Sequence, residues 1–426
     1  MGLSLPIFGP KWEMIRYIAL TASVLLLLLS PSVVAAVDDI TVIASEVVID
    51  FPGQAAFTLE AESSTDIVDV RLCYQVDKMD YAEIVSEGWA DFTPASRVDA
   101  AWVWDMNNAS LPPGAEVTYW WVIEDANGNR LETSPETMHF DDDRYDWQSL
   151  TSSIPEGNEI TIFWYEGNNA FAQELMDTCK EGLAGLTQDV GACPERPIDV
   201  FIYASTDDLK GAMVFPQEWT GGVAFTAFST IAIGISPSEL DWGKRALVHE
   251  LTHLVVHQVT FSPYGQLPVW LDEGLAMYNE GELQPIFSSC LEQAIQEDEL
   301  ISVRSLCSPF SAETEKARLS YAQSYSIAQY LLDNYGQDKM LDLLALSKEG
   351  STYDEALTGV YGFDIDGLDA RWRQTLGSQI AMASESRQPD LALTAVLLAA
   401  ATALGLWGAL ALKKRASRTS SGKSTL

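Results

Sequence analysis

Three of the four histidines in this chain lie close together, in the stretch RALVHELTHLVVHQ at residues 245–258. His249, Glu250 and His253 form the pattern H-E-x-x-H within it. On a helix, residues i and i+4 lie on one face about one turn apart. The two imidazoles can therefore reach one zinc ion, and Glu250 lies beside them.

A zinc ion that does chemistry needs a third protein ligand and an open position for water. His257 lies on a similar helix face, but roughly 12 Å of helix separate it from His249. Two nitrogen ligands of one zinc ion lie within about 4 Å of each other. We therefore exclude His257 and interpret it as a histidine at the C-terminal end of the helix, where the helix dipole favours it.

A second stretch, LPVWLDEGLAMY at 267–278, contains a better candidate ligand, Glu273, and nineteen residues lie between it and His253. The pairing of HELTH with VWLDEGLAMY resembles the gluzincin metallopeptidases, especially their aminopeptidase-N-like and peptidase MA-like branches. The resemblance covers about residues 157–345. It implies a Zn²⁺ cofactor with His249, His253 and Glu273 as ligands, and Glu250 as the general base.

This set of residues suits the hydrolysis of an amide. Two neutral imidazoles and one carboxylate leave a bound Zn²⁺ with net positive charge, which lowers the pKa of a coordinated water. Glu250 can take the proton of that water and deliver it to the leaving amine. We expect hydrolysis of peptide bonds in a peptide or protein substrate, with endo- or exopeptidase action left open. Two alternatives are an inactive surface binding or scaffold protein with a structural zinc site, and a zinc hydrolase of a non-peptide amide.

Other residues are candidates for supporting roles. GGVAF at 221–225 is either an edge strand that pairs with an extended substrate or an ordinary strand. The resemblance implies an oxyanion-stabilising tyrosine, although each candidate could equally be an ordinary helix residue. The candidates are Tyr321, Tyr325 and Tyr278. Thermolysin-like enzymes carry an aspartate four residues after the ligand glutamate, where this chain has Met277, so Asn279 or Glu280 is expected to orient a histidine instead.

The elements that must position these residues indicate an α+β fold. Residues 38–145 contain short alternating runs separated by turn signals such as FPG and LPPG, which predict an immunoglobulin-like β-sandwich. From residue 157 onward, strands are followed by helices. We predict a zincin-like metallopeptidase domain at 157–383, with a mixed sheet, the H-E-x-x-H helix and a helical subdomain at 286–383.

The two ends of the chain predict export and membrane anchoring. Basic residues and an apolar run at 17–29 predict a signal peptide at 1–36. Residues 391–412 carry no charge and would form roughly 33 Å of helix, enough for a transmembrane helix. The basic tail at 413–426 predicts a cytoplasmic C-terminus. We therefore expect a single-pass protein of the cell membrane, with the lipid bilayer as a partner and the peptidase domain extracytoplasmic.

The net charge bears on the choice of binding partner, and the cysteines bear on possible disulfides. The net charge of −36 excludes nucleic acid as a partner. In an oxidising compartment, Cys179–Cys193 and Cys290–Cys307 are natural local pairs that leave Cys73 over, although the connectivity stays open. The sequence leaves the oligomeric state open as well.

Overall fold

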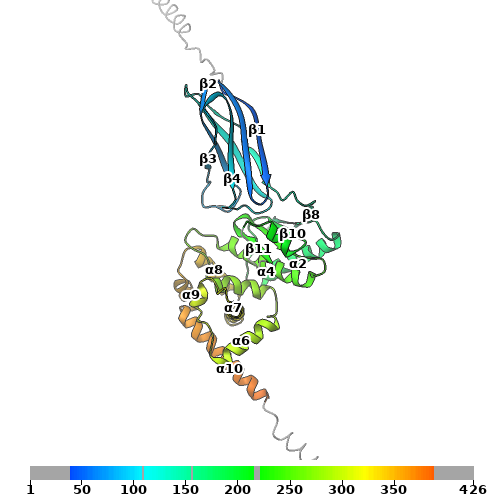
Figure 1. The fold of residues 1–426 in the computed structure, drawn as a ribbon. Coiled ribbons are helices and arrows are strands. Elements are labelled where there is room, and N and C mark those ends of the chain that lie inside the picture. The colour runs from blue at the N-terminus through cyan, green and yellow to red at the C-terminus, as the bar shows by residue number, and fades with distance from the viewer. Residues whose placement is uncertain (1–38, 108–109, 155–156, 215–220, 388–426) are drawn as a thin grey trace, which may run out of the picture.

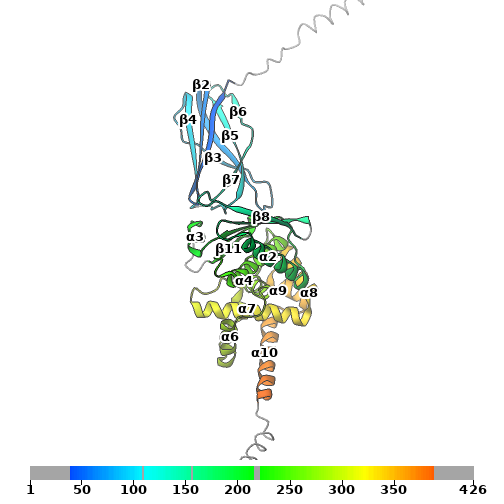
Figure 2. The same cartoon turned by 90° about the vertical axis from the view of Figure 1, so that its right-hand side faces the viewer.

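The computed structural model describes residues 39–107, 110–154, 157–214 and 221–387. Figures 1 and 2 show three parts in succession along the molecule. A β-sandwich lies at one end, a second sheet lies against it, and helices cover the other face of that second sheet. The functional residues of the sequence analysis all fall in the second sheet and its helices.

Strand β2 organises the first part. The strands are β1 (Thr41–Asp50), β2 (Gln54–Val76), β3 (Ser86–Trp89), β4 (Ala95–Asp105), β5 (Ala115–Asp125), β6 (Arg130–Glu132) and β7 (Glu136–Phe140). The first half of β2 pairs with β1 and β4, and its second half pairs with β3 and β5. β6 and β7 then pair with β5. The two groups of strands, joined through β2, enclose one aromatic core that includes Phe57, Tyr119 and Trp121.

The second sheet has five strands in the order β11-β12-β10-β9-β8. Its strands are β8 (Gln148–Ser153), β9 (Glu159–Trp164), β10 (Ile198–Tyr203), β11 (Gly222–Phe225) and β12 (Thr230–Gly234). β9, β10 and β12 are parallel, whereas β8 and β11 are antiparallel strands at the two edges. The sheet is therefore mixed, as expected, and it begins at Gln148, earlier than the sequence indicated.

Most of the helices pack against one face of this sheet and against each other, whereas α3 lies on the sandwich side, where Leu209 joins the sandwich core. They are α2 (Asn169–Asp189), α3 (Thr206–Gly211), α4 (Leu240–Thr260), α5 (Val269–Asn279), α6 (Pro285–Glu297), α7 (Thr314–Tyr335), α8 (Gln337–Lys348), α9 (Tyr353–Tyr361) and α10 (Ile365–Arg387), with short 3-10 turns η2 (Thr226–Phe228) and η3 (Ser305–Cys307). Val200 and Ile202 of β10 share a core with Leu247 and Leu251 of α4. This contact fixes α4, the helix of the H-E-x-x-H pattern, on the sheet.

The opposite face of the sheet is buried as well. Phe201, Tyr203 and Ala232 belong to the same core as the sandwich residues Phe51 and Phe140. Alternate residues of β10 therefore point to the helices and to the sandwich, because successive side chains of a strand point to opposite faces. The sandwich is the third layer of the fold.

The described residues contain no helix that is both long and apolar enough to cross a membrane. The long helices α4 and α10 carry charges such as Asp241, Lys244, Asp369 and Arg373. This finding corrects the predicted C-terminal transmembrane helix and the single-pass membrane localisation, whereas the bilayer as a partner stays a prediction. The segment 391–412 itself lies outside the described residues, as does the predicted signal peptide.

The expected local disulfides are not formed. All five cysteines are free. Cys179 is a residue of α2 and is fully buried in the core. The Cys193 thiol lies 3.4 Å from the hydroxyl of Thr187. The side chain of Cys307 donates to the carbonyl of Val303 one turn earlier. These thiols pack as small apolar side chains rather than as paired cross-links.

Candidate metal centre

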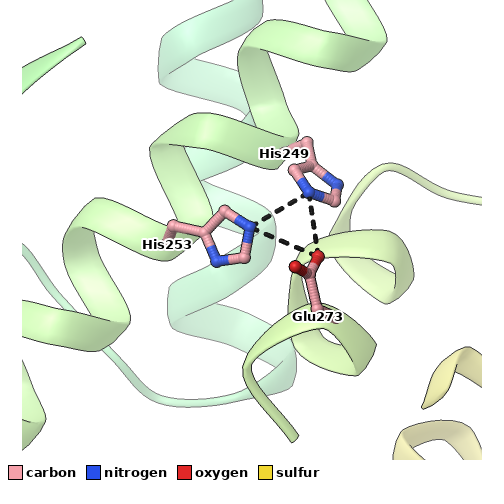
Figure 3. A group of neighbouring side chains, drawn as sticks. All are labelled: His249, His253 and Glu273. Atoms are coloured by element: carbon pink, nitrogen blue, oxygen red, sulfur yellow. Dashed lines mark hydrogen bonds and ion pairs between the residues drawn. The ribbon is translucent and has the colours of Figure 1, made fainter. Parts of the chain in front are cut away.

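Two helices bring the predicted ligands together. Leu247, Leu251 and Leu254 of α4 are fully buried in the core, which sets the rotation of the helix and directs His249 and His253 towards α5. Figure 3 shows both imidazoles and the Glu273 carboxylate of α5 converging on one point. The site is therefore built on rigid helices, which hold side-chain geometry better than loops.

A glycine allows α5 its close position. A Cβ at Gly274 would collide with the carbonyl oxygen of Ser324 on α7, so only glycine permits this approach. Trp270 and Leu271, earlier on α5, are almost completely buried. Glu273 is thereby fixed from two sides, by α7 behind it and by the core below.

The donor atoms have the spacing of ligands on a single ion. His249 Nε2 and His253 Nε2 lie 3.0 Å apart, and Glu273 Oε2 lies 3.3 Å and 3.5 Å from them. Ligand atoms bound at about 2.0–2.1 Å to a tetrahedral zinc ion lie about 3.4 Å from each other. Glu273 Oε2 is also buried without a hydrogen-bond partner. The three side chains therefore fit a zinc ion.

Carboxylates hold the opposite nitrogens of both imidazoles. His249 Nδ1 lies 2.6 Å from Glu280 Oε1, and His253 Nδ1 lies 3.1 Å from Asp272 Oδ1. Arg245 Nη2 in turn lies 3.2 Å from Glu280 Oε2. Such partners fix the ring orientation and leave each Nε2 as the ligand atom.

The sequence suggested either Asn279 or Glu280 as the residue that orients a histidine, and in the structure these two residues have different contacts. Glu280 orients His249, whereas Asn279 donates to Thr252 Oγ1 at 2.8 Å and ties the end of α5 to α4. Sequence reasoning missed Asp272 in this role. Its position next to Glu273 was a usable signal, because adjacent helix residues at the start of α5 can both point towards α4.

Neighbouring carboxylates shift the pKa values of both imidazoles so that the protonated rings are favoured. Burial opposes protonation of His249, but the neighbouring carboxylates of Glu273 and Glu280 outweigh it and raise its pKa to about 9. Burial also opposes protonation of His253, yet Asp272 and Glu273 raise its pKa well above the usual range. Burial would raise the pKa of Glu273, but the two imidazoles bring it far below its usual value. Carboxylates that stabilise two protonated rings would also stabilise a divalent cation there.

Glu250 lies between the imidazoles and the edge strand β11. A Cβ on Gly222 would lie 3.0 Å from the Cγ and Oε1 of Glu250, so β11 passes close to this side chain and a larger residue at 222 would press on it. Burial raises the pKa of Glu250, while His253, His249 and the backbone of Ala224 favour its ionised form. A half-buried carboxyl with a raised pKa beside a metal site is suited to exchanging a proton.

One of the three candidate tyrosines faces this group. Burial raises the pKa of Tyr321, and the charges that raise it further are those of Glu273 and Glu250. Tyr325 and Tyr278 have their charged neighbours elsewhere. Of the three candidates, Tyr321 of α7 is thus the tyrosine on which the charges of Glu250 and Glu273 act.

Comparison with known proteins finds a family that this part of the chain resembles. Residues 178–378 match the model of the Peptidase MA superfamily. No curated protein matches the chain. Among solved structures, the M1 zinc metallopeptidase from Deinococcus radiodurans is similar, with a TM-score of 0.36 and 12% sequence identity over 77% of this chain and 90% of that chain. The match over residues 178–378, which include both motif helices, supports a gluzincin-like peptidase domain in this part of the chain.

Proposed function

We propose that the protein is a zinc-dependent peptidase in which His249, His253 and Glu273 hold the metal and Glu250 is the general base. The observation that carries this proposal is the convergence of three donor atoms with mutual distances of 3.0, 3.3 and 3.5 Å. The half-buried carboxyl of Glu250, which is not one of the three donors, lies beside them. A structural zinc site has no use for that carboxyl, so Glu250 favours the enzyme over a scaffold.

The residues of the chain then have distinct tasks. His249, His253 and Glu273 would hold a zinc ion, which when bound would lower the pKa of water and polarise the substrate carbonyl. Glu250 accepts a proton from the attacking water and passes it to the nitrogen of the departing amine, so the proton count balances. Tyr321 donates a hydrogen bond to the oxygen that becomes negative, because its raised pKa keeps the hydroxyl protonated.

The edge strand β11 would hold the substrate. β11 pairs with β12 on one side and is the last strand of the sheet on the other. An extended peptide can add to such an edge through backbone hydrogen bonds. Because Gly222 lies against Glu250, a peptide bound along β11 would place a backbone carbonyl next to the general base.

The proposal is tested by comparing wild type with Glu250→Gln, each loaded with zinc. We expect about one zinc per chain in both proteins, because Glu250 is not among the three converging donors. Cleavage of a broad peptide library should fall by about 10²–10⁴-fold in Glu250→Gln. Glu282→Gln, an exposed change just after α5, is the matched control and should keep full activity.

Two results would contradict the proposal. If wild type binds no zinc, the three residues are not a metal site. If zinc-loaded wild type cleaves no peptide, the site is structural or acts on another amide, and N-acyl amides in the same assay would then separate these two cases.

A further inference from the structure

A cavity of about 650 Å³ lies directly beside the metal centre. His253 and Asp272 line it on the side of the site, and Val256 and His257, one turn further along α4, extend its wall. The loop between α4 and α5 contributes Leu267. A volume of this size is typical of a ligand site and exceeds the space that a single water-filled gap needs.

The sandwich supplies part of the cavity wall. Tyr81, in the segment between β2 and β3, lines the cavity and stacks on Phe261, with ring centroids 4.4 Å apart and an interplanar angle of 11°. The hydroxyl of Tyr81 donates to the carbonyl of Ser262. Met79 N–H donates to the carbonyl of Ala227 at 2.7 Å, which ties the same segment to the turn after β11. Residues far apart in the sequence thus form one wall.

The lining determines which side chain would fit. Leu267 and Val269 are apolar, and Tyr81 and Phe261 add aromatic rings, whereas uncharged polar groups come from Thr226, Thr260, Ser262 and Gln266. Asp272 is the single Asp, Glu, Lys or Arg among the described residues that line the cavity. His253 also lines the cavity, but it is one of the three proposed metal ligands, so Asp272 is the charged lining group that an acidic side chain would meet, and it would repel one. The cavity therefore favours a large apolar side chain and disfavours an acidic one.

We propose that this cavity is a substrate subsite for a large apolar residue, and that Tyr81 of the sandwich is a specificity-determining residue. The inference rests on the proposed peptidase function and names the substrate class of that site. It also gives His257 a place, as part of the subsite wall, where its ring lies 5.7 Å from that of Phe261.

The position of the cavity fixes the side of the cleaved bond. Thr226 and Ala227, which line the cavity, directly follow Phe225 at the end of β11. A peptide that pairs antiparallel to β11, the commoner kind of pairing, has its N-terminal part beside these residues. The subsite therefore takes a residue on the N-terminal side of the scissile bond.

The test compares Tyr81→Ala with wild type on two peptides that differ only at this substrate position, one with phenylalanine and one with alanine. We expect the ratio of kcat/KM for the two peptides to fall by roughly tenfold, because the phenylalanine peptide loses its contact with the aromatic wall. Tyr81→Phe keeps the ring and should keep the wild-type ratio. Ile84→Ala changes the same segment outside the cavity and should also leave the ratio unchanged.

A second variant tests the cavity independently of the contact between sandwich and peptidase domain. Gly265 lines the cavity, and a Cβ there would meet no atom within 4 Å. Gly265→Trp should lower kcat/KM for the phenylalanine peptide by roughly tenfold and spare the alanine peptide.

The outcomes separate this inference from the proposed function. If wild type cleaves neither peptide nor any library member, the peptidase proposal fails. If wild type cleaves peptides but Tyr81→Ala and Gly265→Trp change both peptides equally, the subsite assignment is wrong and the peptidase proposal stands. Mass spectrometry of the products shows which side of the cleaved bond carries the large residue, and enrichment on the C-terminal side would overturn the predicted orientation.

Discussion

At the scale of single residues, the orienting carboxylates decide how well the site would hold its metal. Glu280 fixes His249 and is itself held by Arg245, whereas Asp272 fixes His253 and is more exposed. We expect Glu280→Gln to lower zinc affinity by about 10–100-fold, because an amide no longer provides a charged acceptor for the ring N–H. Competition with a fluorescent chelator measures this change.

Asp272→Asn should weaken zinc binding less than Glu280→Gln, because water screens the more exposed Asp272 better. Glu282→Gln again serves as the control. Equal affinities in all four proteins would show that neither carboxylate orients a ligand.

Tyr321 is the residue for which a kinetic signature is expected. Tyr321→Phe removes the hydroxyl near Glu273 and Glu250 but keeps the ring. Loss of an oxyanion donor costs about 10²–10³-fold in kcat, so kcat should fall by this amount while KM and zinc content stay unchanged. Tyr325→Phe, one turn further along α7, should behave as wild type. A similar loss in Tyr325→Phe, or none in Tyr321→Phe, would remove Tyr321 from this role.

The sequence was most informative at this scale because ligand spacing is a local property. An i, i+4 pair on one helix and a carboxylate on the following helix are visible in two short motifs, and the structure brings His249, His253 and Glu273 together. The choice of Tyr321 over Tyr325 was not visible, because it depends on how α7 lies across α5. Three-dimensional packing, not spacing, decides which tyrosine faces the site.

At the scale of elements, the contact between α5 and α7 holds Glu273 in register with α4. Gly274→Ala would force a methyl group into the backbone of Ser324, and since backbone cannot rotate aside, α5 must shift. We expect a loss of about 1–3 kcal/mol in unfolding free energy, together with weaker zinc binding. Chemical denaturation and the chelator assay measure the two effects.

Gly359→Ala is the control for that prediction. Gly359 also lies inside a helix, α9, but its added Cβ would meet only the end of the Leu346 side chain, which can move. Alanine has the higher helix propensity, so this variant should be neutral or slightly stabilised. If Gly274→Ala behaves like Gly359→Ala, α5 has more freedom than its contact with α7 indicates.

Strands were harder to predict from the sequence where they contain polar residues. AAFTLEAES and IVDVRLCYQV are two alternating apolar runs separated by polar residues, yet those polar residues remain in the sheet and join both runs into β2. β8 was missed because QSLTSS has little apolar character, and its strand conformation comes from pairing with β9 at the sheet edge. In both cases a neighbouring strand supplies the hydrogen bonds that local sequence does not indicate.

At the scale of the whole molecule, the sandwich completes the peptidase domain rather than lying apart from it. Strands β10 and β12 are apolar on both faces, a pattern typical of strands covered on both sides. The sequence contained this signal, in PIDVFIYAS and TIAIGIS, but could not show what covers the second face. Phe201 packs there beside Gly114 of the sandwich and stacks on Phe163 at 4.6 Å.

Because one core spans both parts, unfolding of the sandwich and of the peptidase sheet should be coupled. Phe201→Ala should lower the unfolding free energy by about 3–5 kcal/mol and shift a single transition, seen alike by tryptophan fluorescence and by loss of peptidase activity. Trp89→Ala, at a side chain that is 65% exposed on the sandwich, should change stability by less than about 0.5 kcal/mol. Two separate transitions, with Phe201→Ala shifting only one of them, would mean that the sandwich folds independently and that Tyr81 reaches the cavity from a separately moving domain.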